Sequence, residues 1–395
     1  MNVKQPTTKK QAFDRIMRLG LVSKAELMKM LTITSTSLTR VLEELLNDGL
    51  IIASELGRST GGRKPILYKV NPAHRAVFGV EISRFFSSIG LYDLELKPLA
   101  FKRWKMDEGM TPDKLIQKIV LLAEQMLKER SINREQVIGI GVGAVGPLSR
   151  EEGIILKPRH FPAKGWSNVP LAKRLEQQLG LPALLDNGAN TAIIGEHWAL
   201  RDEKVQHMLY VHAGVGLRTA MMSGGQIVRG AVDMEGSFGQ MIIQTDGPRL
   251  GDEGNYGALE AFVSIPALEK RIQLALASDQ LRATSVSTLQ DIRFDALQDA
   301  LLSKDAIVTE QFMQTASYLG IGIANLINIL HPEAVILGGP LVNVHRTVYD
   351  KVIEVARSNI YYSPQYEPAF SQGQLTEDAV TAGAAVMMLQ EWDLS

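Results

Sequence analysis

The sequence contains no cysteine, which excludes disulfide bonds and thiol chemistry and leaves histidine and carboxylates as the only strong metal ligands. It has no run of about 18 apolar residues, so we expect no membrane-spanning helix. The first residues lack the apolar segment of a secretory signal peptide. Together these absences predict a cytoplasmic protein that does not bind membranes.

The chain also has little net charge, a formal −1 over 395 residues, but that charge is unevenly distributed. Residues 1–75 contain 13 Lys and Arg against 6 Asp and Glu, a net charge of +7. The remaining 320 residues carry a net charge of −8. A basic module joined to a mildly acidic body indicates that the module binds a polyanion. The length is sufficient for two or three domains, each with its own core.

The basic module has the pattern of a winged helix-turn-helix. Three helices are expected, at residues 9–19, 25–31 and about 35–48. Gly20 ends the first helix, and Ser23 with Glu26 forms a capping box at the start of the second. Thr34 or Ser35 caps the third, and two strands follow at residues 50–54 and 66–70. This order of elements predicts binding to double-stranded DNA.

The third helix is expected to be the recognition helix, because its first turn exposes short hydroxyl side chains and one cation. These residues are Ser35, Thr36, Ser37, Thr39 and Arg40. Short side chains at the start of a recognition helix approach base edges closely. The face of the helix expected to be buried carries Leu38, Val41, Leu42, Leu45 and Leu46. The alternative is that the hydroxyl cluster is only a solvated helix cap.

Glycines and cations fill the segment between the two strands. The candidate DNA-binding residues here are Arg58, Ser59, Gly61, Gly62, Arg63 and Lys64. Glycine lets the backbone approach DNA, and the cations reach phosphates or the minor groove. A solvated basic hairpin is the alternative, but a position directly after a helix-turn-helix favours a wing.

The acidic body has the pattern of an α/β fold. Strands are expected at residues 77–82, 87–91, 137–142, 183–185, 208–212 and 334–337. Helices are expected at residues 111–128, 171–179, 191–199, 310–330 and 378–387. Several strands end in glycine-rich segments and are expected to feed helices, a pattern typical of α/β layers with anion-binding loops. No repeat of 20–50 residues is evident, although a duplication of two α/β halves would leave no sequence identity.

Several motifs together make the chain resemble the ROK family, which contains repressors and sugar kinases. They are Ser59-Thr60-Gly61-Gly62-Arg63, Gly165-Trp166-Ser167-Asn168-Val169-Pro170-Leu171, Asp186-Asn187-Gly188-Ala189-Asn190, Gly224-Gly225-Gln226-Ile227-Val228-Arg229-Gly230, Leu259-Glu260, and Asn325-Leu326-Ile327-Asn328 with Leu337-Gly338-Gly339. The resemblance covers nearly the whole chain. It implies a winged helix-turn-helix in residues 1–75 and, in residues 76–395, an actin/hexokinase-like (ribonuclease H-like) body of two α/β lobes. It also implies a sugar cleft between the lobes and a homo-oligomer, a dimer or a tetramer.

The chain departs from the family's kinases at two positions that matter for catalysis. The kinases carry a catalytic Asp where this sequence has Gly188. Their first phosphate loop, Asp-x-Gly-Gly-Thr, is replaced here by Glu81-Ile82-Ser83-Arg84-Phe85. Loss of a positioned general base alone typically slows a reaction by about 10²–10⁴-fold. We therefore expect no kinase activity and no catalytic residue.

The zinc site that the resemblance implies is also altered. Its ligands, one His and three Cys, fall on Gln240, Gly251, Glu253 and Ala258. Glycine and alanine have no ligating side chain, so a tetrahedral zinc site is not expected, nor is any other cofactor. Residues 254–257 are expected to remain a turn that packing and hydrogen bonds hold.

The sugar contacts implied by the resemblance are partly retained. They fall on Asn187, Gly188, Ser237, Gln240 and Glu260. Only Asn187 and Glu260 keep the usual residue. Arg159 and His160 occupy a segment where relatives contact sugar, and Arg218 follows a glycine-rich loop. These cations suit a phosphorylated or acidic sugar, although Arg159 and Arg218 in ordinary ion pairs are the alternative.

These observations predict a DNA-binding transcriptional regulator, a repressor of carbohydrate uptake or metabolism genes, controlled by a sugar derivative in a non-catalytic cleft. One alternative is a regulator that a protein partner controls, with a vestigial cleft. Another is an active sugar kinase, which Gly188 opposes. The short junction at residues 71–75 predicts constrained motion of the DNA-binding module.

Overall fold

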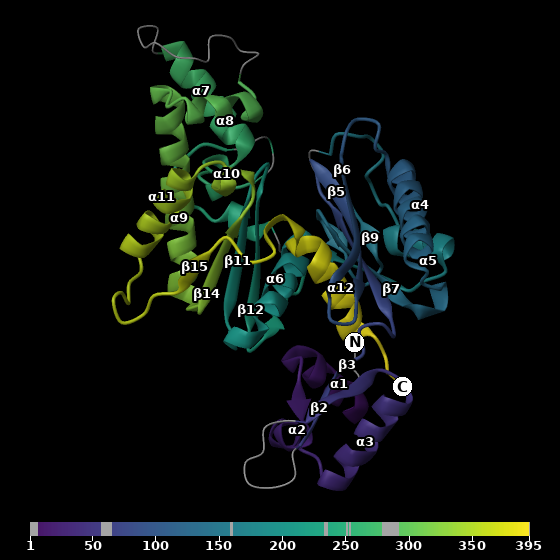
Figure 1. Ribbon diagram of the computed structural model, residues 1–395. Coiled ribbons are helices and arrows are strands. Elements are labelled where there is room, and N and C mark those ends of the chain that lie inside the picture. The colour runs from purple at the N-terminus through teal and green to yellow at the C-terminus, as the bar shows by residue number, and fades with distance from the viewer. Residues whose placement is uncertain are drawn as a thin grey trace. The chain divides into compact units, whose positions relative to one another are not determined.

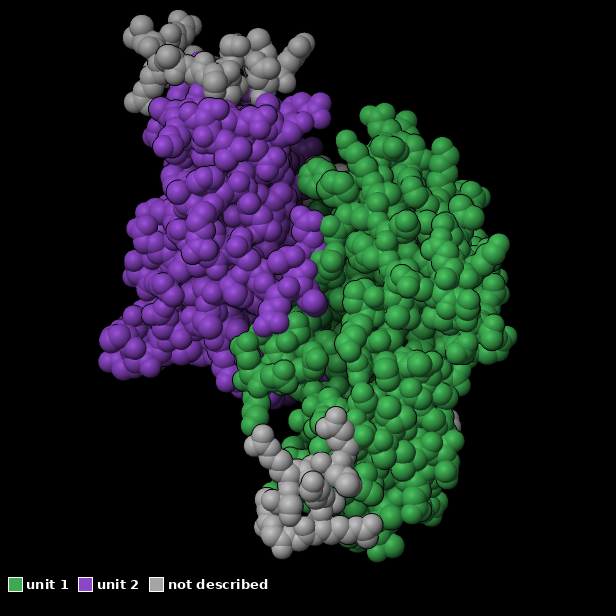
Figure 2. All heavy atoms as spheres, viewed as in Figure 1, with its two compact units in different colours: residues 1–204, 378–395 green, residues 205–377 purple. Residues whose placement is uncertain are grey.

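The computed structural model describes residues 7–56, 65–158, 161–232, 236–249, 252, 254–278 and 292–394. The chain divides into two compact units, residues 1–204 with 378–395 (unit 1) and residues 205–377 (unit 2), as Figure 2 shows. The basic module belongs to unit 1. Over the described ranges, no helix has both the length and the apolar character needed to cross a bilayer.

The basic module consists of three helices and a small antiparallel sheet (Figure 1). Its elements are α1 (Thr8–Leu19), β1 (Val22–Ser23), α2 (Lys24–Met30), α3 (Ser35–Asn47), β2 (Ile51–Leu56) and β3 (Ile66–Val70), with sheet order β1-β3-β2. The expected caps are present. Gly20 follows α1 with φ of 73°, Ser23 and Glu26 form the capping box of α2, and the Thr34 hydroxyl accepts from the Ser37 amide. The helix-turn-helix prediction is therefore confirmed.

The core of this module comes from the apolar faces of the three helices. Phe13, Ile16, Leu27, Leu38 and Leu45 are fully buried. Leu46, expected to be buried, is only half-buried because it lies at the edge of the buried stripe of α3. The proposed wing residues Arg58, Ser59, Gly61, Gly62, Arg63 and Lys64 lie outside the described residues.

The rest of unit 1 is a three-layer α/β lobe. Its strands are β4 (Ala76–Ile82), β5 (Phe86–Asp93), β6 (Pro98–Lys105), β7 (Val137–Ala144), β8 (Leu148–Ser149), β9 (Ile154–Ile155) and β10 (Ala183–Asn187). Its helices are α4 (Pro112–Arg130), α5 (Leu171–Leu179), α6 (Gly188–Ala199) and α12 (Ala379–Glu391), with short 3₁₀ turns at Arg134–Gln136, Arg201–Glu203 and Thr376–Asp378. The main sheet has the order β10-β7-β4-β5-β6. In Figure 1, α4 and α5 cover one face of this sheet and α6 and α12 cover the other.

Glycines allow α12 to lie directly on the sheet. A Cβ on Gly79 would lie 1.9 Å from the Thr381 carbonyl oxygen, and one on Gly141 equally close to that of Ala384. A Cβ on Gly383 of α12 would lie 1.7 Å from the Thr191 carbonyl oxygen of α6. The backbones of β4, β7, α6 and α12 therefore pack in direct contact at these glycines.

Unit 2 repeats the topology of this lobe. Its strands are β11 (Met208–Ala213), β12 (Leu217–Ser223), β13 (Gln226–Ile227), β14 (Ala334–Gly338) and β15 (Ala369–Ser371). Its helices are α7 (Ile265–Ser278), α8 (Phe294–Leu302), α9 (Ala306–Leu330), α10 (Pro340–Asn343) and α11 (Arg346–Ser358), with 3₁₀ turns η3 (Ser237–Gln240) and η4 (Leu259–Ala261).

In both units the first strand pairs antiparallel with the second and parallel with the fourth, giving the order 3-2-1-4-5. The duplication that the sequence conceals is therefore present, and the ribonuclease H-like prediction is confirmed.

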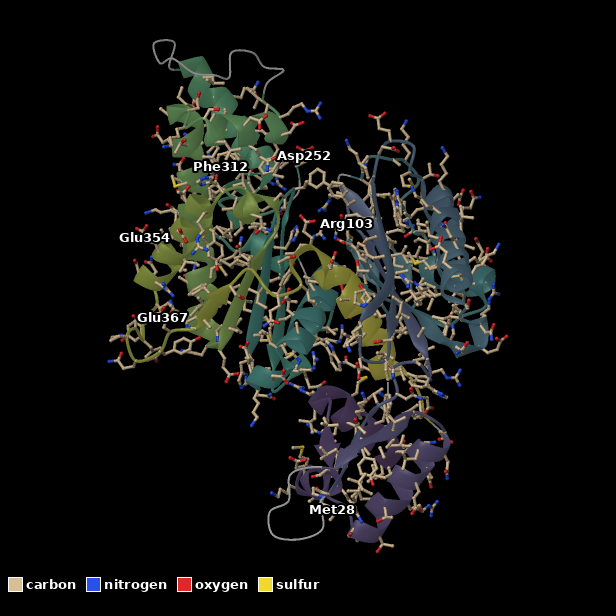
Figure 3. The ribbon with its side chains drawn as sticks, in the orientation of Figure 1. Met28, Arg103, Asp252, Phe312, Glu354 and Glu367 are labelled. Carbon is tan, nitrogen blue, oxygen red and sulfur yellow. The ribbon has the colours of Figure 1, made fainter. Side chains whose placement is uncertain are left out.

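The core of unit 2 lies between its sheet and the long helices α9 and α11. Leu209 and Leu337 from the sheet meet Phe312 and Ile323 from α9, all fully buried. Figure 3 labels Phe312, which points into this core. Asp305 begins α9 by accepting from the Val308 amide at 3.0 Å.

Several element predictions are corrected by the structure. Two glycine-rich segments lead into antiparallel strands instead of helices. One connects β7 to the β8–β9 hairpin, and the other is the turn between β11 and β12. Helix α6 begins at Gly188, three residues before the expected start, because Asn187 caps it. Strands β1, β6, β8, β9, β12, β13 and β15 and helices α7, α8, α10 and α11 were not predicted. Strand β6 carries Lys102, Arg103 and Lys105 on a sheet edge, where polar residues obscure the pattern.

Candidate functional site

The first turn of α3 presents three exposed hydroxyl side chains, as predicted. Ser35, Thr36 and Ser37 are exposed, and Arg40 extends into solvent while pairing with Glu44 at 2.9 Å. The Ser37 hydroxyl lies 2.9 Å from that of Thr34. Ser35 and Thr36 have no side-chain hydrogen bond within the described ranges. Their contact with DNA stays a prediction.

Thr39 differs from the other candidates because its side chain bonds to another helix, α2. It donates to the Ser35 carbonyl oxygen at 2.9 Å and accepts from the Lys24 ammonium at 2.5 Å. Thr39 thus holds α2 against α3. Lys24, the first residue of α2, adds a cation beside the recognition helix that the sequence analysis missed, although its position directly after a capping Ser was a usable signal.

Several contacts among the described residues join the DNA-binding module to the rest of unit 1. The Lys10 ammonium, 6% exposed, donates to the Leu389 carbonyl oxygen at 3.0 Å, near the end of α12. The Phe13 and Trp392 rings meet edge to face with centroids 5.9 Å apart. An Arg18 nitrogen lies 2.9 Å from the Nε2 of His197, in the last turn of α6. These contacts agree with the predicted constraint on the module's motion.

The retained sugar-contact residue Asn187 lies where β10 passes into α6. Its side-chain oxygen caps the helix by accepting from the Asn190 amide at 2.7 Å. Gly188 is the first residue of α6 and is buried. Gly188 therefore contributes only backbone at the position where the resemblance implies the catalytic Asp of kinases.

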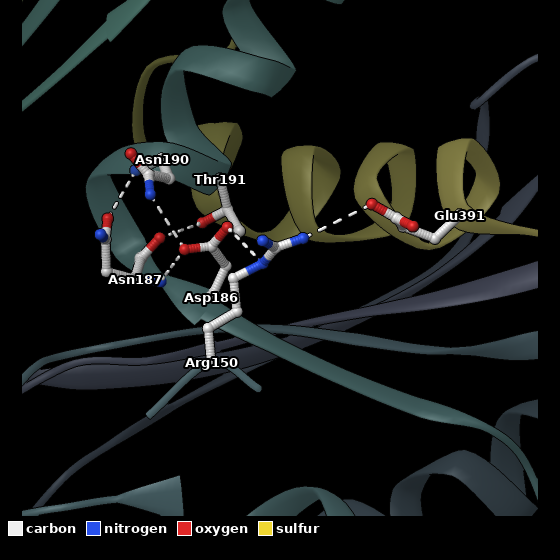
Figure 4. Close-up of polar contacts among 6 residues, drawn as sticks. All are labelled: Arg150, Asp186, Asn187, Asn190, Thr191 and Glu391. Atoms are coloured by element: carbon white, nitrogen blue, oxygen red, sulfur yellow. Dashed lines mark hydrogen bonds and ion pairs between the residues drawn. The ribbon is translucent and has the colours of Figure 1, made fainter. Parts of the chain in front are cut away.

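A network of polar side chains surrounds the corner where β10 passes into α6 (Figure 4). One oxygen of buried Asp186 accepts from the Asn187 amide at 2.8 Å and from the Asn190 side chain at 2.9 Å. The other lies 3.6 Å from Nε of Arg150, whose Nη2 lies 3.5 Å from Glu391 at the end of α12. Arg150 thus connects the candidate sugar corner with the end of the helix that contacts the DNA-binding module.

The segment equivalent to the first phosphate loop is a tight hairpin between β4 and β5. The amide and hydroxyl of Ser83 both donate to the Phe86 carbonyl oxygen, at 3.1 and 2.6 Å. Phe85 and Phe86 are exposed at the tip. Since bulky side chains occupy the tip, the hairpin lacks the open glycine backbone that surrounds a phosphate.

In unit 2 the structure brings Gln240 and Glu260 together. The Gln240 amide nitrogen donates to a Glu260 carboxylate oxygen at 3.1 Å, and both residues are half-buried. Ser237, at the first position of η3, is exposed. Asn187 and Gly188 belong to unit 1 and these three residues to unit 2.

Of the candidate ligand-binding cations, the structure describes Arg218 but not Arg159 and His160. Arg218, on β12 opposite His212, is half-exposed and makes no ion pair with any described residue. Its availability for an anionic ligand therefore stays a prediction. Arg159 and His160 lie outside the described residues. Asn255 was missed as a site residue, because its contact with Gln240 is made by backbone and amide groups.

The fold and these two sites define a class of protein in which a helix-turn-helix module precedes a two-lobed, sugar-kinase-like body. The ROK family model matches residues 77–391, and the chain belongs to the ROK family. This confirms the resemblance that the sequence motifs carried.

The chain is similar along most of its length to a xylose repressor of Caldicellulosiruptor bescii, at 26% identity over 372 residues, 94% of this chain and 92% of that repressor. A crystal structure of a ROK family transcriptional regulator, a homologue of the E. coli MLC protein, superposes with a TM-score of 0.78 at 20% identity, covering 97% of this chain and 96% of that one. A Streptomyces griseus ROK glucokinase, solved with glucose and AMPPNP, gives a TM-score of 0.66 at 22% identity, covering 79% and 98%. The regulators thus match nearly the whole chain, whereas the kinase leaves a fifth of it unmatched.

Proposed function

We propose that this chain is a cytoplasmic transcriptional repressor of carbohydrate uptake or metabolism genes. In this proposal residues 1–75 bind a double-stranded operator, and residues 76–395 bind a sugar effector and form the homo-oligomer. The observation that carries the proposal is the exposed first turn of α3, set on a body whose kinase-base position is the side-chain-free Gly188. Coverage of a xylose repressor over most of its length supports the same assignment.

The site residues are assigned by the same argument. Contacts to DNA bases come from Ser35, Thr36, Ser37 and Arg40, with Thr39 in a supporting position. Contacts to the DNA backbone come from Arg58, Ser59, Gly61, Gly62, Arg63 and Lys64. The effector-binding residues are Arg159, His160, Asn187, Gly188, Ser237, Gln240 and Glu260. Arg218 adds a positive charge suited to a phosphorylated or acidic sugar.

DNA binding is tested by selecting operators from random double-stranded DNA with the purified full chain. We expect one enriched, roughly palindromic motif, because a symmetric oligomer presents two recognition helices. Thr36→Ala should weaken binding to it about fivefold to 150-fold, as a lost base contact costs ~1–3 kcal/mol. Asn47→Ala, at the exposed far end of α3, is the matched control. Absence of any enriched motif would contradict the proposal.

The effector is tested by a thermal-shift screen with D-xylose, D-glucose, sugar phosphates, acidic sugars and ATP. A ligand at 100 times its Kd adds about 2.7 kcal/mol of stability. A sugar that raises Tm and changes operator affinity identifies the effector class. Intact operator binding with no sugar response would replace sugar control by control through a protein partner. ATP-dependent phosphorylation of any sugar would contradict the repressor assignment for the body.

A further inference from the structure

The side chain of Gln240 connects three separate segments of unit 2. Its Oε1 accepts from the Asn255 amide at 2.9 Å, and its Nε2 donates to Glu260 on η4 at 3.1 Å. The Asn255 side chain returns a bond to the Gln240 carbonyl oxygen at 3.0 Å. One amide side chain therefore joins η3, the loop at Asn255 and η4.

The backbone around this amide is closed by hydrogen bonds of its own. The Ile243 amide donates to the Gly257 carbonyl oxygen at 2.9 Å, and the Leu259 amide to that of Met241 at 2.8 Å. Gly257 has φ of 68°, and a Cβ there would lie 1.7 Å from the Gln244 carbonyl oxygen. The turn therefore requires glycine, and backbone hydrogen bonds close it.

The donor set at the positions equivalent to the family's zinc ligands does not fit zinc. Gln240 offers a neutral amide whose oxygen and nitrogen both have protein partners, and Ala258 has no ligating atom. Gly251 and Glu253 lie outside the described residues. Elsewhere in the described ranges, no group of three or more His, Cys, Asp or Glu is arranged to hold a metal ion. Zinc sites need thiolate, imidazole or carboxylate ligands in a tetrahedral set.

The carboxylate that Gln240 contacts lies between two glycines. A Cβ on Gly216 would lie 2.5 Å from Oε1 of Glu260, and one on Gly239 would lie 3.2 Å from Oε2. The Ser264 hydroxyl donates to the Glu260 carbonyl oxygen at 2.9 Å. The Ser264 hydroxyl thus holds the backbone of Glu260, and the Gln240 N–H is one of the contacts that orient its carboxylate.

We propose that Gln240 replaces the zinc ion of metal-binding relatives, anchoring the loop at Asn255 and positioning the Glu260 carboxylate for a sugar hydroxyl. Gln240 is a positioning residue because it acts through Glu260. The loop-anchoring part stands on the contacts of unit 2 alone, whereas the sugar part rests on the proposed function.

Two variants of the full chain separate the two roles. Gln240→Met removes both the acceptor and the donor. Gln240→Glu keeps an acceptor for the Asn255 amide but removes the donor to Glu260. Gln244→Glu, an exposed side chain in the same segment, is the matched control.

The first readout needs no sugar. Hydrogen–deuterium exchange at the Asn255 amide should be about tenfold faster in Gln240→Met, since a hydrogen bond is lost, and near wild type in Gln240→Glu and the control. Wild-type protein expressed with added zinc should contain no stoichiometric metal, and EDTA should leave its Tm unchanged. Stoichiometric zinc, an EDTA-lowered Tm, or unchanged exchange in Gln240→Met would overturn the proposal.

The second readout is a titration with D-xylose and D-glucose between pH 5 and pH 8. In Gln240→Glu a second carboxylate lies beside Glu260, and the repulsion between the two raises the pKa of the pair. At low pH the two carboxylates share a proton, which replaces the hydrogen bond that the Gln240 amide made to Glu260. Gln240→Glu should therefore bind the responding sugar more weakly at pH 8 and recover at pH 5, whereas Gln244→Glu should follow wild type. A pH-independent loss in Gln240→Glu would reject the positioning role. No response of wild type to either sugar would count against these sugars as effectors, and the exchange and metal readouts would still decide the anchoring role.

Discussion

If the proposed function is right, Gly188 is a position at which a repressor differs from the sugar kinases of its fold. It begins α6 directly after Asn187, which keeps its capping bond to the Asn190 amide. The corner therefore keeps a capped helix start, while Gly188 provides no carboxylate that could accept a proton. Restoring Asp at this position would supply the base but not the open loop, because Ser83 closes the β4–β5 hairpin.

Among the polar residues of unit 2, Arg271 is the one whose replacement we expect to destabilise the protein most. Its guanidinium donates to the Phe262 carbonyl oxygen at 2.5 Å, to Gln311 and to the Thr315 hydroxyl, tying α7 to α9. Burial lowers the pKa of this guanidinium. Its partners are neutral acceptors. If the guanidinium is removed, these acceptors lose their donor.

Arg271→Met should destabilise the protein by about 1–3 kcal/mol, because it leaves partly buried acceptors without a donor. The measurement is urea unfolding followed by circular dichroism. Lys270→Met, the exposed neighbour on α7, is the control and should change little. Equal unfolding midpoints for the two variants would show that water replaces the guanidinium without cost.

Helix α12 is the element on which the most distant parts of unit 1 converge. It packs on the sheet through Gly79 and Gly141, and its end carries the carbonyl of Leu389 that Lys10 contacts. Arg103, labelled in Figure 3, pairs with Asp378 just before its start at 2.8 Å. The last helix of the chain therefore completes the first lobe and supports the N-terminal module.

Trp392→Leu should loosen the N-terminal module without unfolding it. The edge-to-face contact with Phe13 is worth ~0.5–1.5 kcal/mol beyond burial, so amide exchange in α1 should rise about threefold to tenfold. Far-ultraviolet circular dichroism should stay unchanged. Tyr361→Leu removes an exposed aromatic ring of unit 2 and serves as the control. Exchange in α1 equal to wild type would mean that Lys10 and Arg18 alone hold the module.

At the scale of the whole molecule, a sugar repressor requires that effector and operator affect each other's affinity. Unit 1 contains a continuous set of contacts for this, from Asn187 through Asp186 and Arg150 to Glu391, next to Trp392 (Figure 4). Helix α6 provides a second connection, from Gly188 at its start to His197 and Arg18 at its end.

We predict that the effector changes operator affinity by about 5–150-fold and that operator changes effector affinity by the same factor. Arg150→Met should reduce this factor while leaving each ligand's separate binding within about twofold. The test measures both affinities by fluorescence anisotropy and calorimetry, each with and without the other ligand. Arg174→Met breaks a surface pair with Asp113 in the same lobe and is the control. An undiminished coupling factor in Arg150→Met would exclude this route.

Local chemistry in the sequence determined the helix-turn-helix, because its caps lie within three or four residues of the groups they satisfy. Ser23 with Glu26, Thr34 with Ser37 and Gly20 after α1 are all such cases. The sequence likewise determined that position 188 has no side chain to act as a base, since glycine lacks one in any fold.

Only the tertiary structure decided which distant residues meet. Gln240 and Glu260 are 20 residues apart, and Arg150 and Glu391 are 241 apart, so no local pattern encodes either contact. The exposed edge strand β6 and the duplicated sheet order were hidden for the same reason, because pairing across a sheet joins strands without regard to their spacing in the chain. Sequence thus determined which groups were available, and packing determined which of them became partners.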